Sequence, residues 1–232
     1  MFQTKYLLTG SVVLSTALFF HNIALAGIPF DSAKVSLTEN KVYVGNLKAG
    51  GNSRHPAEIG TAVTAKEFVA TDAASRAELK FEDNSIVRVG QNSIFSFDAG
   101  SRTLSLKEGT MLFYIPHGSG GGNIKTPSFT AAITGTVGKV SKNLLGVLKG
   151  EVKVTVDGKV YVVPAGWVLE VIDHQVRLFK YKPGFATSGA LYYFGGLLPE
   201  TPDLGGNPYN NTDPLLNRPT HEPPPLPTRQ DF

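Results

Sequence analysis

Apolar and polar residues alternate along most of this chain, and this pattern predicts β-strands. Across residues 77–82, Leu79 and Phe81 fall on one side of an extended backbone and Glu78 and Lys80 on the other, because successive strand side chains point to opposite faces. The segment therefore predicts a half-buried sheet whose charged residues form a solvated face.

Similar runs recur over residues 32–181, where no segment keeps a helical period of apolar residues. Turn residues separate the runs, and Asp157-Gly158 predicts the tightest hairpin because both of its positions accept positive φ. The predicted strands are 42–44, 77–81, 86–89, 94–97, 104–106, 111–115, 129–134, 137–141, 144–148, 152–156, 160–163, 168–172 and 176–179.

We therefore expect a single all-β domain. Many short strands with tight turns fit a β-sandwich, a roll or a stack of hairpins. The Gly-x-Val elements at Gly135 and Gly150 are too loosely repeated to favour a regular solenoid.

The N-terminal residues differ from this body. Residues 1–26 combine one positive charge, an apolar run and small residues at Ala24 and Ala26, which is typical of a secretory signal peptide. His21 interrupts the run, whereas a membrane anchor needs about 20 apolar residues. We expect a cleaved leader, an exported domain over 27–195 and no transmembrane span after cleavage.

The C-terminal residues differ as well. Residues 196–232 are rich in Pro, Gly and Asn, a composition that favours an extended or disordered tail. The aromatic segment 190–194, just before it, is expected to pack the last ordered element onto the body.

Charge and composition limit the partners and cofactors. The chain has 22 Lys and Arg against 19 Asp and Glu, too even a balance to attract nucleic acid. It has no cysteine, and the histidines after the leader lack the spacing of a metal site (His55, His117, His174 and His221). We expect no nucleic-acid partner, no metal and no cofactor.

Catalytic patterns are also missing from the sequence. Glu78 and Glu82 are better explained as a solvated strand face than as the paired acids of a glycosidase. No nucleophile elbow is present, and the glycine-rich residues 118–122 lack the Lys-Ser/Thr of a phosphate-binding loop. We expect a non-enzymatic protein, with a hydrolase assembled from distant loops as the residual alternative.

Residues 67–171 contain four short motifs built largely from turn residues. The first two are Val69-Ala-Thr71 with Ser75-Arg-Ala-Glu-Leu79, and the hairpin Glu82-Asp-Asn-Ser-Ile-Val-Arg88. The other two are Lys125-Thr-Pro127 with Gly135-Thr136, and Leu148-Lys-Gly-Glu-Val152 with Pro164-Ala-Gly-Trp167. In this order the motifs resemble the periplasmic domain of the FecR family, in which glycine usually takes the place of Asn84. Asn84, Gly135, Gly150 and Gly166 are expected at positive φ or at a close backbone approach.

The resemblance implies an exported β-rich domain that senses or contacts another macromolecule and is not an enzyme. Family members that regulate transcription carry a cytoplasmic segment before a membrane span, and only Met1 to Lys5 precede the apolar run here. We therefore expect a stand-alone relative, or the exported half of such a system, in the periplasm or secreted.

Two kinds of partner follow from these observations, and the oligomeric state stays open. The first is an envelope protein bound by a sensor or interaction module. The second is a cell-wall polysaccharide such as peptidoglycan, bound through exposed aromatic rings. The candidate ligand-binding residues for the second are Trp167, Tyr161, Tyr192 and Tyr193.

Overall fold

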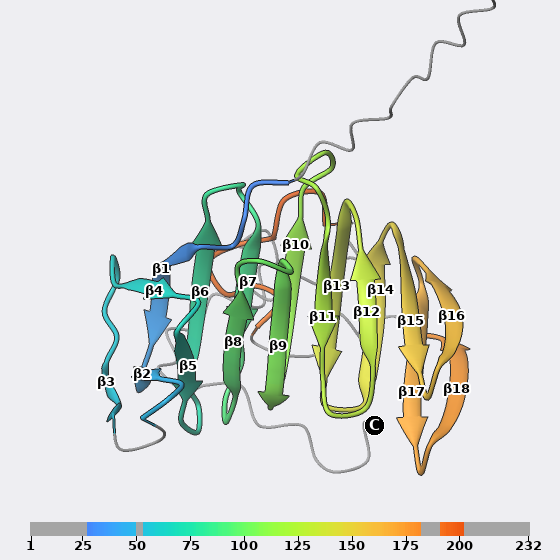
Figure 1. The fold of residues 1–232 in the computed structure, drawn as a ribbon, viewed down its shortest axis with the longest axis horizontal. Coiled ribbons are helices and arrows are strands. Elements are labelled where there is room, and N and C mark those ends of the chain that lie inside the picture. Colours follow the sequence, from blue (N-terminus) through green and yellow to red (C-terminus); the bar gives the residue numbers. More distant parts are fainter. Residues whose placement is uncertain (1–26, 50–52, 182–190, 202–232) are drawn as a thin grey trace, which may run out of the picture.

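The protein is a β-sandwich of two nine-stranded sheets (Figure 1). The computed structural model describes residues 27–49, 53–181 and 191–201. The all-β prediction is confirmed within these residues. The predicted leader, and the predicted tail from residue 202 onward, lie outside them.

The two sheets are named here by their strands. Sheet I has the order β18 (Gln175–Lys180), β17 (Trp167–Ile172), β14 (Leu144–Lys149), β13 (Thr136–Ser141), β10 (Thr110–Ile115), β7 (Ile86–Val89), β6 (Arg76–Phe81), β1 (Ser32–Glu39) and β4 (Ala62–Thr64). Sheet II has the order β16 (Lys159–Pro164), β15 (Glu151–Val156), β12 (Thr130–Ile133), β11 (Gly122–Lys125), β9 (Thr103–Glu108), β8 (Ile94–Asp98), β5 (Glu67–Thr71), β2 (Val42–Asn46) and β3 (His55–Pro56).

The chain builds this sandwich by placing hairpins in the two sheets alternately. The hairpins β6–β7, β13–β14 and β17–β18 belong to sheet I, and β8–β9, β11–β12 and β15–β16 to sheet II. Each new hairpin lies beside an earlier one, so the chain advances from one end of the sandwich to the other (Figure 1). Of the predicted arrangements, the protein therefore combines the sandwich with the stack of hairpins.

Each of the thirteen predicted strands coincides with an observed strand to within a few residues at either end, and β5 corresponds to the FecR-like segment at Val69. The strands β1, β3, β4 and β11 have no counterpart among them. The strands β3 and β4 contain two and three residues, and β11 buries one apolar side chain, Ile124. These three strands are too short to show an alternating run in the sequence, whereas β1 has eight residues and alternates at its start, where Ala33 and Val35 are buried.

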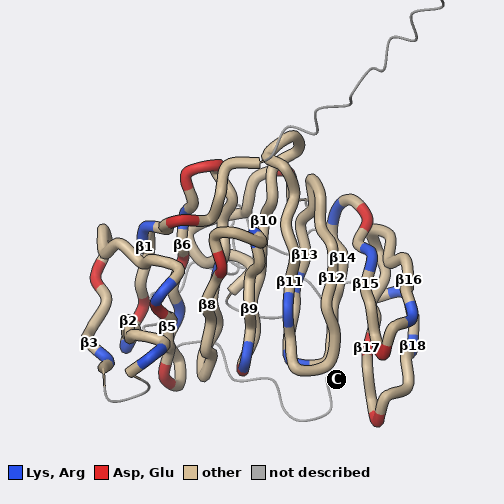
Figure 2. The backbone as a smooth tube through the Cα atoms, in the orientation of Figure 1, with Lys and Arg blue, Asp and Glu red and all other residues tan. Residues whose placement is uncertain are grey.

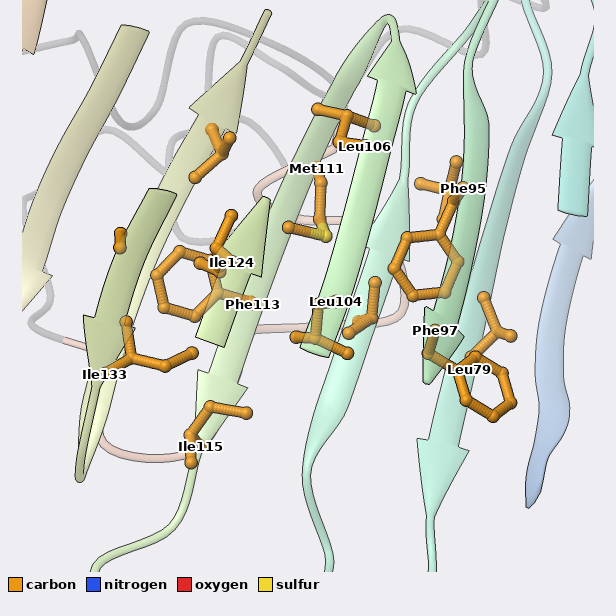
Figure 3. Close-up of a cluster of buried hydrophobic side chains, with 14 of the residues drawn as sticks. Leu79, Phe95, Phe97, Leu104, Leu106, Met111, Phe113, Ile115, Ile124 and Ile133 are labelled. Atoms are coloured by element: carbon orange, nitrogen blue, oxygen red, sulfur yellow. The ribbon is translucent and has the colours of Figure 1, made fainter. Parts of the chain in front are cut away.

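One hydrophobic core lies between the sheets. Leu79 and Phe113 of sheet I meet Phe95, Leu104 and Ile133 of sheet II, and all five are fully buried (Figure 3). Burial of one such side chain contributes about 1.5–3 kcal/mol. The core thus contains the apolar face that the alternation at residues 77–81 predicts.

The hairpin predicted at Asp157-Gly158 is confirmed. Val156 of β15 pairs with Lys159 of β16, and the two turn residues have φ of 46° and 78°. Positive φ at both central positions matches the turn to the twist of the flanking strands.

The predicted glycine positions mark places where the chain crosses between the sheets. Gly135 leads from β12 into β13 and Gly150 from β14 into β15, with φ of 57° and 85°. A Cβ atom on Gly150 would lie 2.9 Å from the carbonyl oxygen of Gly135. The two crossings are therefore in contact, and a side chain at Gly150 would push them apart.

Gly150→Ala should destabilise the fold more than Gly158→Ala. Both substitutions put an L-residue at positive φ, which costs about 1–2 kcal/mol, but nothing lies within 4 Å of a Cβ at Gly158. Urea unfolding midpoints of the two variants provide the test. Equal losses would show that the contact with Gly135 does not matter.

Candidate interaction surfaces

The four candidate aromatic residues separate into two places. Tyr192 and Tyr193 are buried on the outer face of sheet I. Trp167 and Tyr161 are half-buried and pack against the edge of the core, and the Lys180 Nζ lies 5.7 Å from the centre of the Trp167 ring. The four rings do not form one exposed platform of the kind that sugar binding uses.

The outer face of sheet I is covered by residues 191–201, which we call the C-terminal strap. Tyr192, Tyr193 and Leu198 of the strap form a second apolar cluster with Leu112 and Tyr114 of β10. The first six residues of the predicted tail, 196–201, are therefore part of the folded body, because the sheet offers them an apolar surface. The prediction that the aromatic segment packs onto the body is confirmed for Leu191, Tyr192 and Tyr193.

Arg88 fastens the middle of the strap. Its Nε donates a hydrogen bond to Glu78 Oε2 (2.8 Å), and its Nη1 donates to the carbonyl oxygens of Tyr192 (2.9 Å) and Gly196 (2.7 Å). Burial lowers the pKa of Arg88, whereas the Glu78 carboxylate raises it. The guanidinium stays charged at neutral pH because its ordinary pKa is so high. Its hydrogen bonds therefore connect Glu78 of the sheet to two backbone carbonyls of the strap.

Glu200 fastens the far end of the strap. Its carboxylate accepts hydrogen bonds from Lys149 Nζ (2.6 Å) and from the Tyr114 hydroxyl (3.3 Å). The bond from Lys149 is the main reason that the pKa of Glu200 lies below its usual value. Burial and the nearby Glu200 raise the pKa of Tyr114.

The prediction of a solvated charged face at residues 78–82 is wrong for Glu78. Lys80 and Glu82 are exposed, but Glu78 is buried beneath the strap, opposite Arg88 in the β6–β7 hairpin. The partner could have been found from the sequence by folding the hairpin about Asp83-Asn84. The burial of Glu78 could not have been found in this way, because the covering residues come more than a hundred positions later in the chain.

A second buried ion pair joins three loops. Arg102 donates from Nη2 to Asp83 Oδ2 (2.6 Å) and from Nε to the carbonyl oxygen of Gly121 (2.6 Å). Its guanidinium also lies 4.0 Å from the centre of the Phe30 ring. The hairpin turn at Asp83, the turn at Arg102 and the glycine-rich loop are thus tied together, which gives these charged groups a structural role.

Catalytic groupings do not appear among the described residues. No three potential metal ligands come together in this part of the chain. Two surface hollows adjoin Asn40 and Lys41, and each holds one acid, Glu58 or Asp72, where acid–base chemistry would need two acids.

Residues 27–49, 53–181 and 191–201 contain no helix that could span a membrane. Charges of both signs occur along the whole sandwich (Figure 2).

The end of the sandwich formed by β16 and β18 differs from the rest of the surface. We call it the open end, because neither strand has a partner on its outer side among the described residues. Trp167, Tyr161 and Val176 line it as half-buried side chains, and Leu178 is 43% exposed. Edge strands of this kind are surfaces that proteins either protect or use for pairing.

Comparisons with known proteins identify the middle of the chain. Residues 67–156 match the family model described as FecR protein. The chain contains a FecR domain. The match begins where the sequence resemblance begins and ends within it, so the resemblance is confirmed.

Two crystal structures, at 1.65 and 2.50 Å resolution, of a candidate anti-sigma factor from Parabacteroides distasonis ATCC 8503 are similar to the chain. Each is 14% identical with a TM-score of 0.47, and the similarity covers 52% of this chain. It covers 63% and 62% of those chains, less than two thirds of their length. No curated protein matched the chain.

The elements that carry the FecR resemblance supply the structural ion pairs. Ser75-Arg-Ala-Glu-Leu79 contributes Glu78, and the hairpin of residues 82–88 contributes both Asp83 and Arg88. Asn84 has φ of 64°, as expected for the residue in the place of the family's glycine. The FecR signature in this chain therefore describes how hairpins are turned and joined.

Arg88→Met should destabilise the protein by about 3–5 kcal/mol, because it leaves the Glu78 carboxylate buried without its cation. Arg76→Met is the matched control. Arg76 lies two residues before Glu78 on β6, and the Arg76–Glu39 pair is partly exposed, so its loss should cost about 1 kcal/mol or less. Urea unfolding gives both values, and similar losses for the two variants would contradict a special role for Arg88.

The end of the strap should loosen at acidic pH. The folded pKa of Glu200 is lowered, so its contribution is present above the unfolded pKa, about 4.3, and is lost as the pH falls through the folded value. The protection factors of the Leu198, Glu200 and Thr201 amides, which correct for the slower intrinsic exchange at low pH, should fall over this pH range in the native protein. In Glu200→Gln the protection factors should be low already at neutral pH; a native-like profile in this variant would exclude the carboxylate as the cause.

Proposed function

We propose that this protein is an exported, non-enzymatic interaction module that binds a partner protein at the cell envelope, in the regulatory manner of FecR domains. The leader-like residues 1–26 support export, and the FecR match supports a signalling-related role. The open end of the sandwich is the observation that carries the proposal. It presents apolar side chains together with edge backbone that has no partner strand among the described residues, which is the combination used in binding by strand addition.

The other described faces are less suited to binding a partner than the open end. The strap already covers the outer face of sheet I. The outer face of sheet II presents small polar and basic side chains in register, among them Ser105, Lys125, Thr130 and Thr155. Such a face is readily solvated, so it has little to gain from a partner.

A photo-reactive amino acid placed at Phe179 should form a covalent adduct with the partner in intact cells. Phe179 is exposed on β18, and the same group at Ile59, exposed near the opposite end, is the matched control. The expected result is an adduct with one protein at position 179 and no adduct at position 59. Equal labelling at both positions, or none in exported and folded protein, would contradict the proposal.

Cell-wall polysaccharide is the other outcome to be tested. Two of the four candidate rings are buried, and Lys180 lies over a third, Trp167. Retention of the protein on insoluble cell wall, lost in a folded Trp167→Ala variant, would replace the protein partner by a sugar.

A further inference from the structure

The two strands of the open end lie level with each other. The turns that start them touch, since His174 Nδ1 lies 3.0 Å from Asp157 Oδ2. At their far ends, the amide of Tyr181 donates to the carbonyl of Gly166, which follows β16. Both strands contain six residues and end the two sheets on the same side of the molecule (Figure 1). The open end is therefore a pair of matched edges.

Exposed apolar side chains gather at this end. Five of the nine large apolar side chains that are exposed in the described residues belong to β16, β17 and β18: Val160, Val162, Ile172, Leu178 and Phe179. Stacked architectures need a polar terminal unit to stay soluble when nothing covers their end. The open end has the apolar composition of a unit that is covered by a neighbour, not that of a polar terminal unit.

The opposite end is protected in the usual ways. Its edge strands β3 and β4 have two and three residues, and β3 ends at Pro56, which has no N–H to donate. Head-to-tail stacking of copies would thus pair six-residue edges with much shorter ones. This mismatch disfavours filaments.

We propose that the partner at the open end is a second copy of this chain, an inference that rests on the proposed function. A two-fold axis perpendicular to the sheets would bring β18 against β18 and β16 against β16, both antiparallel. One added strand from another protein would pair with only one of the two edges, whereas a second copy pairs with both at once. Each sheet would then continue through the dimer.

The side chains of β18 favour one register. With Leu178 on the axis, each Arg177 lies across from Phe179 of the other copy on the outer face, a favourable cation–aromatic pair. With Arg177 on the axis, the two guanidinium groups would face each other. Counting from the two touching turns, Val162 of β16 lies level with Leu178, so apolar side chains meet at the axis in both sheets.

The interface is small. Its twelve edge residues per copy fall below the roughly 20–30 residues of a standard interface. Pro164 also limits the β16 ladder at its last residue. We therefore expect a dimer that dissociates on dilution.

A single Leu178→Cys substitution tests the register directly, because the chain has no cysteine of its own. Antiparallel partners on the axis have Cα atoms about 4.5–5.5 Å apart, within the range of a disulfide. Mild oxidation of the purified full chain should give a covalent dimer. Ile59→Cys, on the exposed opposite side, should stay monomeric under the same conditions.

Sedimentation of the unmodified chain should show a mass that doubles with rising concentration. A Val162→Glu, Phe179→Glu variant should remain a monomer with an unchanged urea midpoint, since both side chains are exposed. A chain that stays monomeric at its solubility limit and forms no disulfide at Leu178 would overturn the dimer. If the chain is monomeric but position 179 forms an adduct with a different protein, the proposed function still stands. If neither a dimer nor an adduct forms, the dimer and the proposed function are both overturned.

Discussion

A hairpin with one apolar face is not stable by itself, and this constraint shapes the whole molecule. Each hairpin of this chain buries that face against hairpins of the opposite sheet, as Leu79 does against Phe95 and Phe97 (Figure 3). Because successive hairpins alternate between sheets, each new one extends the same core. The sandwich grows in one direction, and this growth produces two unlike ends.

The outer faces of the two sheets meet the same constraint differently. Sheet II presents small polar residues to solvent, whereas sheet I carries Leu112 and Tyr114 on its outer side and must be covered. The strap covers these residues, and Arg88 joins it to the hairpin below through carbonyl oxygens and Glu78. A charged residue is tolerated in this buried place because each hydrogen bond it makes has a fixed partner.

The FecR signature acquires a physical meaning from these contacts. Its acidic and basic residues do not converge on a cleft; Asp83 and Arg88 each bind a partner that holds loops or the strap in place. Its glycines allow the chain to cross between sheets, as Gly135 and Gly150 do in contact with each other. A motif made of such residues identifies an architecture.

Most of the strands, most of the turns and the class of the fold could be predicted from the sequence alone, because alternation and positive-φ residues act over a few neighbouring positions. The hairpin at Asp157-Gly158 and the inward side of residues 77–81 needed nothing more. The folded structure was needed to see that Glu78 is buried, that Tyr192 and Tyr193 face a sheet and that β16 and β18 lie level with each other. These features depend on contacts between distant segments, and a local pattern contains no information about which segment will cover which face.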